Sequence, residues 1–184
     1  MKASIFSLVL LMWVVPANSQ ETVELSETTV SYAPYSSNLT NSGNVYSFSI
    51  NEIYSGEFES NPLTFMKKNF DINRFILELK DKNLDACQVS FVSGKGMLKV
   101  DFNKEGKMVK MYQRFRNIKL PNDLSHEIYR DYKGWNIVKN IHVARGRDGR
   151  IDKEFYRLKL ENGNKTKNVR IDRTEATSVE LAIN

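Results

Sequence analysis

Alternation of apolar and polar residues predicts strands along much of the chain. Tyr46, Phe48 and Ile50 fall on one face of segment 45–50, with serines between them. A period of two residues is the pattern of a half-buried β-strand. By the same criterion, further strands are predicted at 89–91, 98–102, 108–115, 135–143, 155–160 and 169–171. In the segment 135–143, we expect Trp135, Ile137, Ile141 and Val143 to share a face.

Apolar residues three or four positions apart predict two helices. The first begins at Pro62, because proline is tolerated where a helix leaves its N–H groups unpaired, and its stripe is Leu63, Met66 and Phe70. The second is capped by Asn122 or Asp123. Its apolar stripe consists of Leu124, Ile128 and Tyr132, and Gly134 is expected to end the helix.

Turn residues divide these elements. Turns are predicted at 94–96 and 103–106, at Asp148-Gly149 and at Asn162-Gly163, because glycine and asparagine tolerate positive φ. Segment 34–44 (PYSSNLTNSGN) is predicted to be a loop, and 23–32 a short edge strand. Segment 71–85 fits either a helix or a strand.

The order of the predicted elements occurs twice. Helix, strand, turn, strand, hairpin and strand follow one another in 62–116 and again in 123–173. Since each helix needs one sheet face to cover its apolar stripe, the expected fold class is α+β, with two tandem helix-plus-antiparallel-sheet units. The other face of the sheet would meet water or a partner; it carries Lys99, Asp101, Arg157 and Lys159.

The N-terminus has the three parts of a secretory signal. Lys2 precedes the apolar segment 3–15, and small residues follow, with cleavage expected after Ser19. A segment of thirteen residues is too short for a comfortable membrane span, which needs about 20 apolar residues. We therefore expect an exported protein, periplasmic or secreted, without a transmembrane segment in the mature chain. The expected division is a signal peptide at 1–19, a polar segment with one or two edge strands at 20–60, a first unit at 61–120, and a second unit with a short tail at 121–184.

Four stretches carry a resemblance to a known family. They are VSF at 89–91, GKGMLKVDFNKEGKMVKMYQRFRNIKLP at 94–121, YKGWNIVKNIHV at 132–143 and YRLKLENGNK at 156–165. The chain resembles small exported proteins of flavobacteria that are similar to PepSY-like domains and, more loosely, to the β-lactamase-inhibitor protein fold of two tandem helix-plus-sheet units. The resemblance covers roughly residues 60–173 and implies a binding module without catalytic residues. Such relatives sometimes carry a nicotinate-mononucleotide adenylyltransferase label, which is disfavoured here because neither His126 nor His142 lies in a His-x-Gly-His turn.

Few residues indicate reactive chemistry. The single cysteine, Cys87, excludes an intramolecular disulfide and is expected to be a small half-buried strand residue. Residues 101–106 match the start of a calcium-binding loop. The twelfth position of such a loop must be a bidentate glutamate, but it is Tyr112 here, so a plain hairpin is expected. The histidines lack a third ligand, and both are expected to be satisfied by water, His142 on the face opposite Ile141. No metal or cofactor is predicted. An enzyme with an unrecognised site that includes Cys87, Asp152 or Glu154 remains the less favoured alternative; Asp152 and Glu154 are expected to share a face as solvated carboxylates.

Charge is distributed unevenly along the chain. Residues 20–103 hold 7 basic and 11 acidic residues, whereas residues 104–173 hold 19 and 9. The candidate surface for an anionic partner is Arg114, Arg116, Lys119, Arg145, Arg147 and Arg150. Such a surface attracts acidic proteins, lipopolysaccharide or phospholipid headgroups, and a solvated strand face is the alternative interpretation. Nucleic acid is not expected, because aromatic residues are not interleaved with the bases.

Together these features predict a non-enzymatic exported binding module that holds a protein or a cell-envelope ligand on an open sheet face. An inhibitor or chaperone of a secreted hydrolase is the alternative. The oligomeric state stays open.

Overall fold

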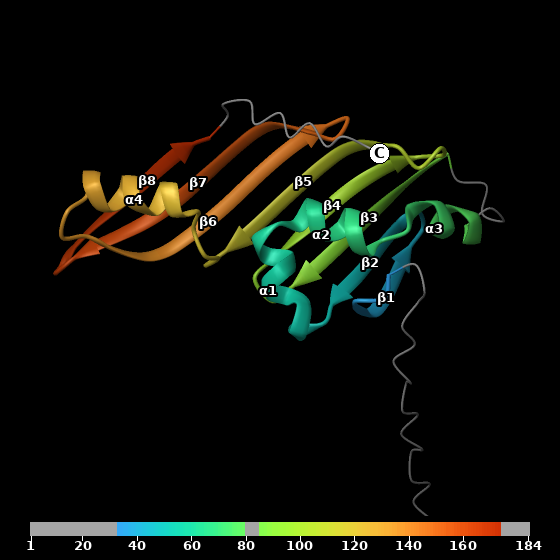
Figure 1. Ribbon diagram of the computed structural model, residues 1–184, viewed down its shortest axis with the longest axis horizontal. Coiled ribbons are helices and arrows are strands. Elements are labelled where there is room, and N and C mark those ends of the chain that lie inside the picture. The colour runs from blue at the N-terminus through green and yellow to red at the C-terminus, as the bar shows by residue number, and fades with distance from the viewer. Residues whose placement is uncertain (1–32, 80–84, 174–184) are drawn as a thin grey trace, which may run out of the picture.

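The computed structural model describes residues 33–79 and 85–173. Within them the chain has an α+β fold of four helices and one open eight-stranded sheet (Figure 1). The signal segment at 1–19 and the strand expected at 23–32 lie outside the described residues. No helix of the described part is both long enough and apolar enough to cross a membrane.

The eight strands follow one another across the sheet in chain order. They are β1 (Ser36–Ser42), β2 (Val45–Ile50), β3 (Ala86–Ser93), β4 (Gly96–Asn103), β5 (Met108–Arg116), β6 (Asn136–Arg147), β7 (Arg150–Asn162) and β8 (Lys165–Asp172). All neighbours pair antiparallel except β2 and β3, which are parallel. A parallel pair needs a long crossover, and the chain between β2 and β3 contains three of the helices.

The helices are α1 (Glu52–Ser60), α2 (Pro62–Asn69), α3 (Ile72–Glu78) and α4 (Asn122–Asp131). The helix predicted from Pro62 is confirmed, and the described beginning of segment 71–85 is helical. Helix α1 was not predicted. The second predicted helix is confirmed as α4, but its N-cap is Pro121 and no side chain caps it, so the predicted role of Asn122 or Asp123 as a cap is wrong.

Two predicted loop features are corrected by the pairing of strands. Segment 34–44 is not a loop, because residues 36–42 form β1 and pair with β2. As an edge strand it needs no apolar alternation, which is why its sequence (SSNLTNS) did not reveal it. The last hairpin turns at Gly163-Asn164, one residue later than predicted, since Asn162 already pairs with Lys165.

All four helices pack against the same face of the sheet, and two apolar clusters result. Helices α1 to α3 cover the first cluster, whose members include Phe48, Phe58, Val89, Leu98 and Phe115. Helix α4 covers the second, which consists of Leu124, Ile128, Tyr156, Leu158 and Leu160. The clusters are joined by one cross-strand row, in which Phe115 pairs with His142 and His142 with Tyr156.

A β-bulge near the start of β6 changes which residues face the helices. The register shifts between Ile137 and Lys139, so Val138 is an extra residue. Ile137 therefore lies beside Leu160 on the helix-covered face, while Ile141 and Val143 point to the other side. The prediction that Ile137, Ile141 and Val143 share a face is wrong for this reason.

Candidate functional site

The open face of the sheet, opposite the helices, carries most of the strand-borne basic residues. The register places Lys110, Arg114 and Arg116 of β5 on this face, together with Lys139, Arg145 and Arg147 of β6. Neighbouring strands add Lys99, Arg150, Lys153, Arg157, Lys159 and Arg170. We call these side chains the basic face.

Most cations of the basic face form no ion pair with any described residue. Arg147 pairs with Asp152 at 2.9 Å, Lys159 with Glu161 at 2.8 Å and Arg170 with Asp172 at 2.6 Å. Among the described residues, the other cations of the basic face form no ion pair. The face therefore carries positive charge that its own carboxylates leave uncompensated.

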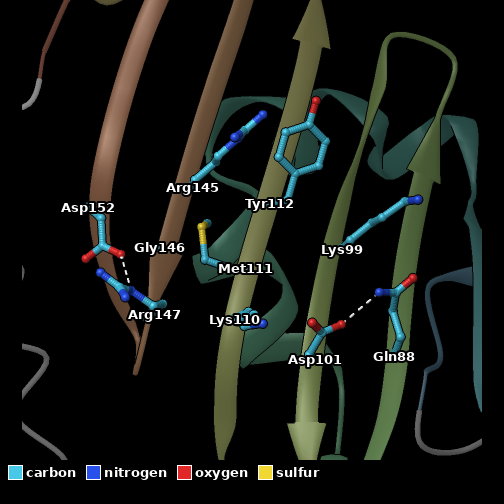
Figure 2. Close-up of a pocket in the computed structure, with 10 residues that line it drawn as sticks. All are labelled: Gln88, Lys99, Asp101, Lys110, Met111, Tyr112, Arg145, Gly146, Arg147 and Asp152. Atoms are coloured by element: carbon cyan, nitrogen blue, oxygen red, sulfur yellow. Dashed lines mark hydrogen bonds and ion pairs between the residues drawn. The ribbon is translucent and has the colours of Figure 1, made fainter.

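A first groove of about 420 Å³ crosses the middle strands (Figure 2). Lys99, Tyr112 and Arg145 stand side by side on β4, β5 and β6, because they are register partners. The Arg145 guanidinium carbon lies 5.4 Å from the centre of the Tyr112 ring. Lys110 lines the same groove, one row along β5. Three unpaired cations thus converge around one half-buried aromatic ring.

The two acidic residues that line this groove, Asp101 and Asp152, each accept a hydrogen bond from a neighbouring side chain. Asp101 accepts a hydrogen bond of 2.8 Å from the Gln88 side chain on β3, on the side of β4 away from β5 (Figure 2). At the opposite border of the groove, the Asp152 carboxylate accepts a hydrogen bond of 2.9 Å from Arg147 Nε. Figure 2 shows the Arg147–Asp152 pair at the lower left and the Gln88–Asp101 pair at the lower right, with Lys110 between them and Arg145, Tyr112 and Lys99 above.

A second groove of about 510 Å³ lies over β6, β7 and β8 at the far end of the same face. Lys139, Arg157, Lys159 and Arg170 surround it. Ile141 adds apolar surface and Asn168 adds an amide, whereas Val169 borders the groove but packs its side chain on the second apolar cluster. Of these cations, Lys139 and Arg157 form no ion pair with a described residue, so the second groove, like the first, combines unpaired cations with an apolar contact.

A buried apolar strip separates the two grooves. Val143 on β6 pairs with Phe155 on β7, and both are buried although no described helix covers them. Two arginines cover Phe155 instead: the guanidinium carbons of Arg170 and Arg157 lie 3.8 and 5.3 Å from its ring centre. Cation–π contacts of this kind hold the arginines over the strip.

The six residues predicted from the sequence divide between two places. Arg114, Arg116, Arg145, Arg147 and Arg150 belong to the basic face, whereas Lys119 lies in the connection between β5 and α4. Of these six residues, Arg145 and Arg147 line the first groove, and none lines the second. Sequence reasoning missed Lys110 and Tyr112 in the first groove, and Lys139 and Arg170 in the second. The two-residue period of these strands was the available signal, since it places Lys110, Tyr112 and Arg114 on one face.

The helix-covered face contains a polar cluster between the two apolar clusters. His142 Nε2 lies 2.7 Å from Glu154 Oε1, and the His142 ring stacks on Tyr156 at 4.4 Å. His142 is buried, so the prediction that water satisfies it is wrong, although it does lie opposite Ile141. Burial and the Glu154 carboxylate raise the pKa of Tyr156 above its usual range. Gln113 is buried nearby, and its Oε1 has no hydrogen-bond partner in the described structure.

The residues of the less favoured enzyme hypothesis do not meet. Asp152 lines the first groove on the open face, while Glu154 contacts His142 on the helix-covered face, so their expected shared face is wrong. A register shift between Arg145 and Gly146 separates them. Cys87 is buried on β3, and burial, with a smaller effect of Asp101, raises the pKa of its thiol. The residues that imitate a calcium loop form the β4–β5 hairpin, in which the Lys107 N–H donates to Asn103 Oδ1 at 2.8 Å.

Comparison of the chain with known proteins finds no matching family model, no curated protein and no solved structure.

Proposed function

We propose that this protein is a non-enzymatic binding module that holds an anionic ligand on the open face of its sheet. The observation that carries the proposal is the basic face itself. Cations surround two grooves on a surface free of described helices, and most of these cations form no ion pair with a described residue. Uncompensated charge of one sign raises the local concentration of oppositely charged partners and speeds their association.

The fold supports this role because the described helices leave one face of the sheet uncovered. The helices that follow β2 and β5 cover the other face, each time before three antiparallel strands. We propose that these are two tandem helix-plus-sheet units of the PepSY-like kind, merged into one sheet. Export through the segment 1–19, which lies outside the described residues, belongs to the same proposal: an exported binding module would meet its ligand outside the cytoplasm.

Binding to a sulfated polymer tests the proposal. Elution of the protein from a heparin column with increasing salt measures the anion affinity of its surface, because each neutralised charge adds to the salt dependence. We expect the double variant R145E/K139E to elute at clearly lower salt than the natural chain.

The matched control is K104E/K133E. It changes the net charge by the same amount, at exposed positions outside the basic face. We expect this control to elute close to the natural chain. Equal losses in both variants would show that only net charge matters and would overturn the proposal.

A further inference from the structure

The two grooves are arranged as two parts of one extended site. Arg145 borders the first groove and Lys139 the second, and both lie on β6, six residues apart. At a rise of about 3.4 Å per residue this separation is about 20 Å. A single small anion can occupy one groove but cannot reach both. A ligand that uses the whole face must therefore be a chain or a large surface.

Each groove offers the same two kinds of contact. The first has Lys99, Lys110 and Arg145 around the Tyr112 ring. The second has Lys139 and Arg157 beside the apolar side chain of Ile141. A partner that fits both grooves needs carboxylates or similar anions, and apolar groups close to them. Acidic polypeptide carries both kinds of group on neighbouring side chains, whereas an acidic polysaccharide offers anions without alkyl or aromatic groups.

The shape of the face disfavours a membrane surface as the partner. Adjacent strands of a sheet are rotated by about 20–25° relative to one another, which gives a rotation of about 90° from β4 to β8. A flat bilayer can then approach the cations of one groove but not those of both. A flexible chain can follow the twist from Lys99 to Lys139.

We infer that the two grooves together bind one acidic polypeptide segment, which extends over about 20 Å across the Val143–Phe155 strip. This inference rests on the proposed function and names its ligand class. Bound at both ends, the segment gains affinity because its second attachment is intramolecular. Phe155, covered by Arg157 and Arg170, lies beneath the middle of the segment.

Oligoglutamates of two lengths test this arrangement. A span of about 20 Å needs about six extended residues, so a probe of about twelve residues reaches both grooves and one of about four reaches only one. By fluorescence anisotropy at low salt, we expect the long probe to bind at least about tenfold more tightly than the short one.

R145E or K139E alone should remove most of this length dependence, and K133E should keep it. R145Q and K139Q repeat the test with smaller perturbation of folding, and circular dichroism checks each variant.

The outcomes separate this inference from the proposed function. Equal affinities for the two lengths overturn the two-groove site. A length dependence that only one of R145E and K139E removes, while the other variant keeps it, also overturns the two-groove site. Tighter binding of an oligogalacturonate of matched length, or of phosphatidylglycerol vesicles, overturns the choice of polypeptide and leaves anion binding in place. If none of these anions binds the natural chain better than R145E/K139E, the proposed function itself fails.

Discussion

Gly146 lies at the β-bulge where β6 and β7 border the first groove. A side chain there has no room, because a Cβ atom on Gly146 would lie 1.9 Å from the carbonyl oxygen of Arg150. The bulge brings the two backbones close and turns Asp152 toward Arg147 on the open face. Glycine at this position is therefore a condition for the geometry of the groove.

G146A is expected to lower the free energy of unfolding by about 2–3 kcal/mol, since the bulge must shift to relieve the overlap. Urea denaturation measures this change. G94A is the control, because no atom lies within 4 Å of its added Cβ and we expect a change below about 0.5 kcal/mol. Equal stabilities of the two variants would contradict the close approach.

Tyr156 gives the folded state a pH dependence at alkaline pH. Burial, and then the Glu154 carboxylate, raise the pKa of its phenol in the folded chain. In the unfolded chain a tyrosine titrates near about pH 10. Above that pH the unfolded state loses the proton while the folded state retains it. The stability linked to Tyr156 is thus fully present below about pH 10 and declines as the pH rises further.

We expect Y156F to show a shallower loss of stability above about pH 10 than the natural chain. Urea denaturation at a series of pH values measures the two slopes. Y129F, which changes a tyrosine that is 59% exposed, should leave the slope unchanged. A parallel decline in Y156F and the natural chain would rule out this role of Tyr156.

Composition and periodicity indicated that the second half of the chain is basic and which strands carry the charge. They did not reveal on which face each charge lies. A bulge inserts one residue and reverses the faces that a strict alternation predicts. The extra residue Val138 places Ile137 on the face opposite Ile141. The bulge opposite Gly146 likewise places Asp152 and Glu154 on opposite faces. These shifts are set by pairing with the neighbouring strand, so a single strand's sequence does not contain them.

At the scale of elements, Asn140 holds the connection between β5 and α4. Its buried side chain donates to the Ile118 carbonyl at 2.8 Å and accepts from the Ile118 N–H at 3.1 Å. Asn117 has a positive φ of 52°, and its side-chain oxygen accepts a hydrogen bond of 3.3 Å from the Asn140 N–H. We call these hydrogen bonds among Asn117, Ile118 and Asn140 the asparagine clamp. The clamp fixes the point at which the chain leaves the sheet, and therefore the position at which α4 covers the second cluster.

N140A is expected to cost about 2–3 kcal/mol of stability, because two backbone groups of Ile118 lose their partner in a buried place. Thermal and urea denaturation measure the loss. The matched control N136A changes an exposed asparagine of the same strand and should stay within about 0.5 kcal/mol of the natural chain. A similar loss in both variants would show that the clamp does not stabilise this connection.

Elements with a complete local signal were predicted, and those without one were missed. Helices α2 and α4 carry apolar stripes, and β4 alternates along its whole length. Strand β1 has almost no apolar residues, and α1 buries only Phe58 and Glu59. The carboxylate of Glu59 is accommodated by Lys95 at 3.0 Å and by the Ser93 hydroxyl at 3.0 Å. A contact between α1 and a turn of the sheet is a property of tertiary structure and leaves no period in the sequence.

For the whole molecule, the α+β class followed from the repeated order of elements, but the joining of all strands into one sheet did not. The joint is the β5–β6 pair, where Phe115 meets His142 and Arg114 meets Val143. On the helix-covered side, the β5–β6 pair connects the two apolar clusters. On the open side, residues of the same pair line the first groove. The same two strands therefore couple the folding of both halves to the geometry of the site.

This coupling predicts that the described structure unfolds in one cooperative transition. Leu98, fully buried in the first cluster, is far along the sheet from Trp135, which packs on the second. L98A should destabilise the protein by about 2–5 kcal/mol. We expect this shift to appear equally in far-ultraviolet circular dichroism and in Trp135 fluorescence, measured with Trp13 replaced by phenylalanine. L160A, in the second cluster, provides the reciprocal control and should also move both signals together. If L98A shifted circular dichroism while the Trp135 transition stayed in place, the two halves would unfold independently, and the row from Phe115 through His142 to Tyr156 would not join them.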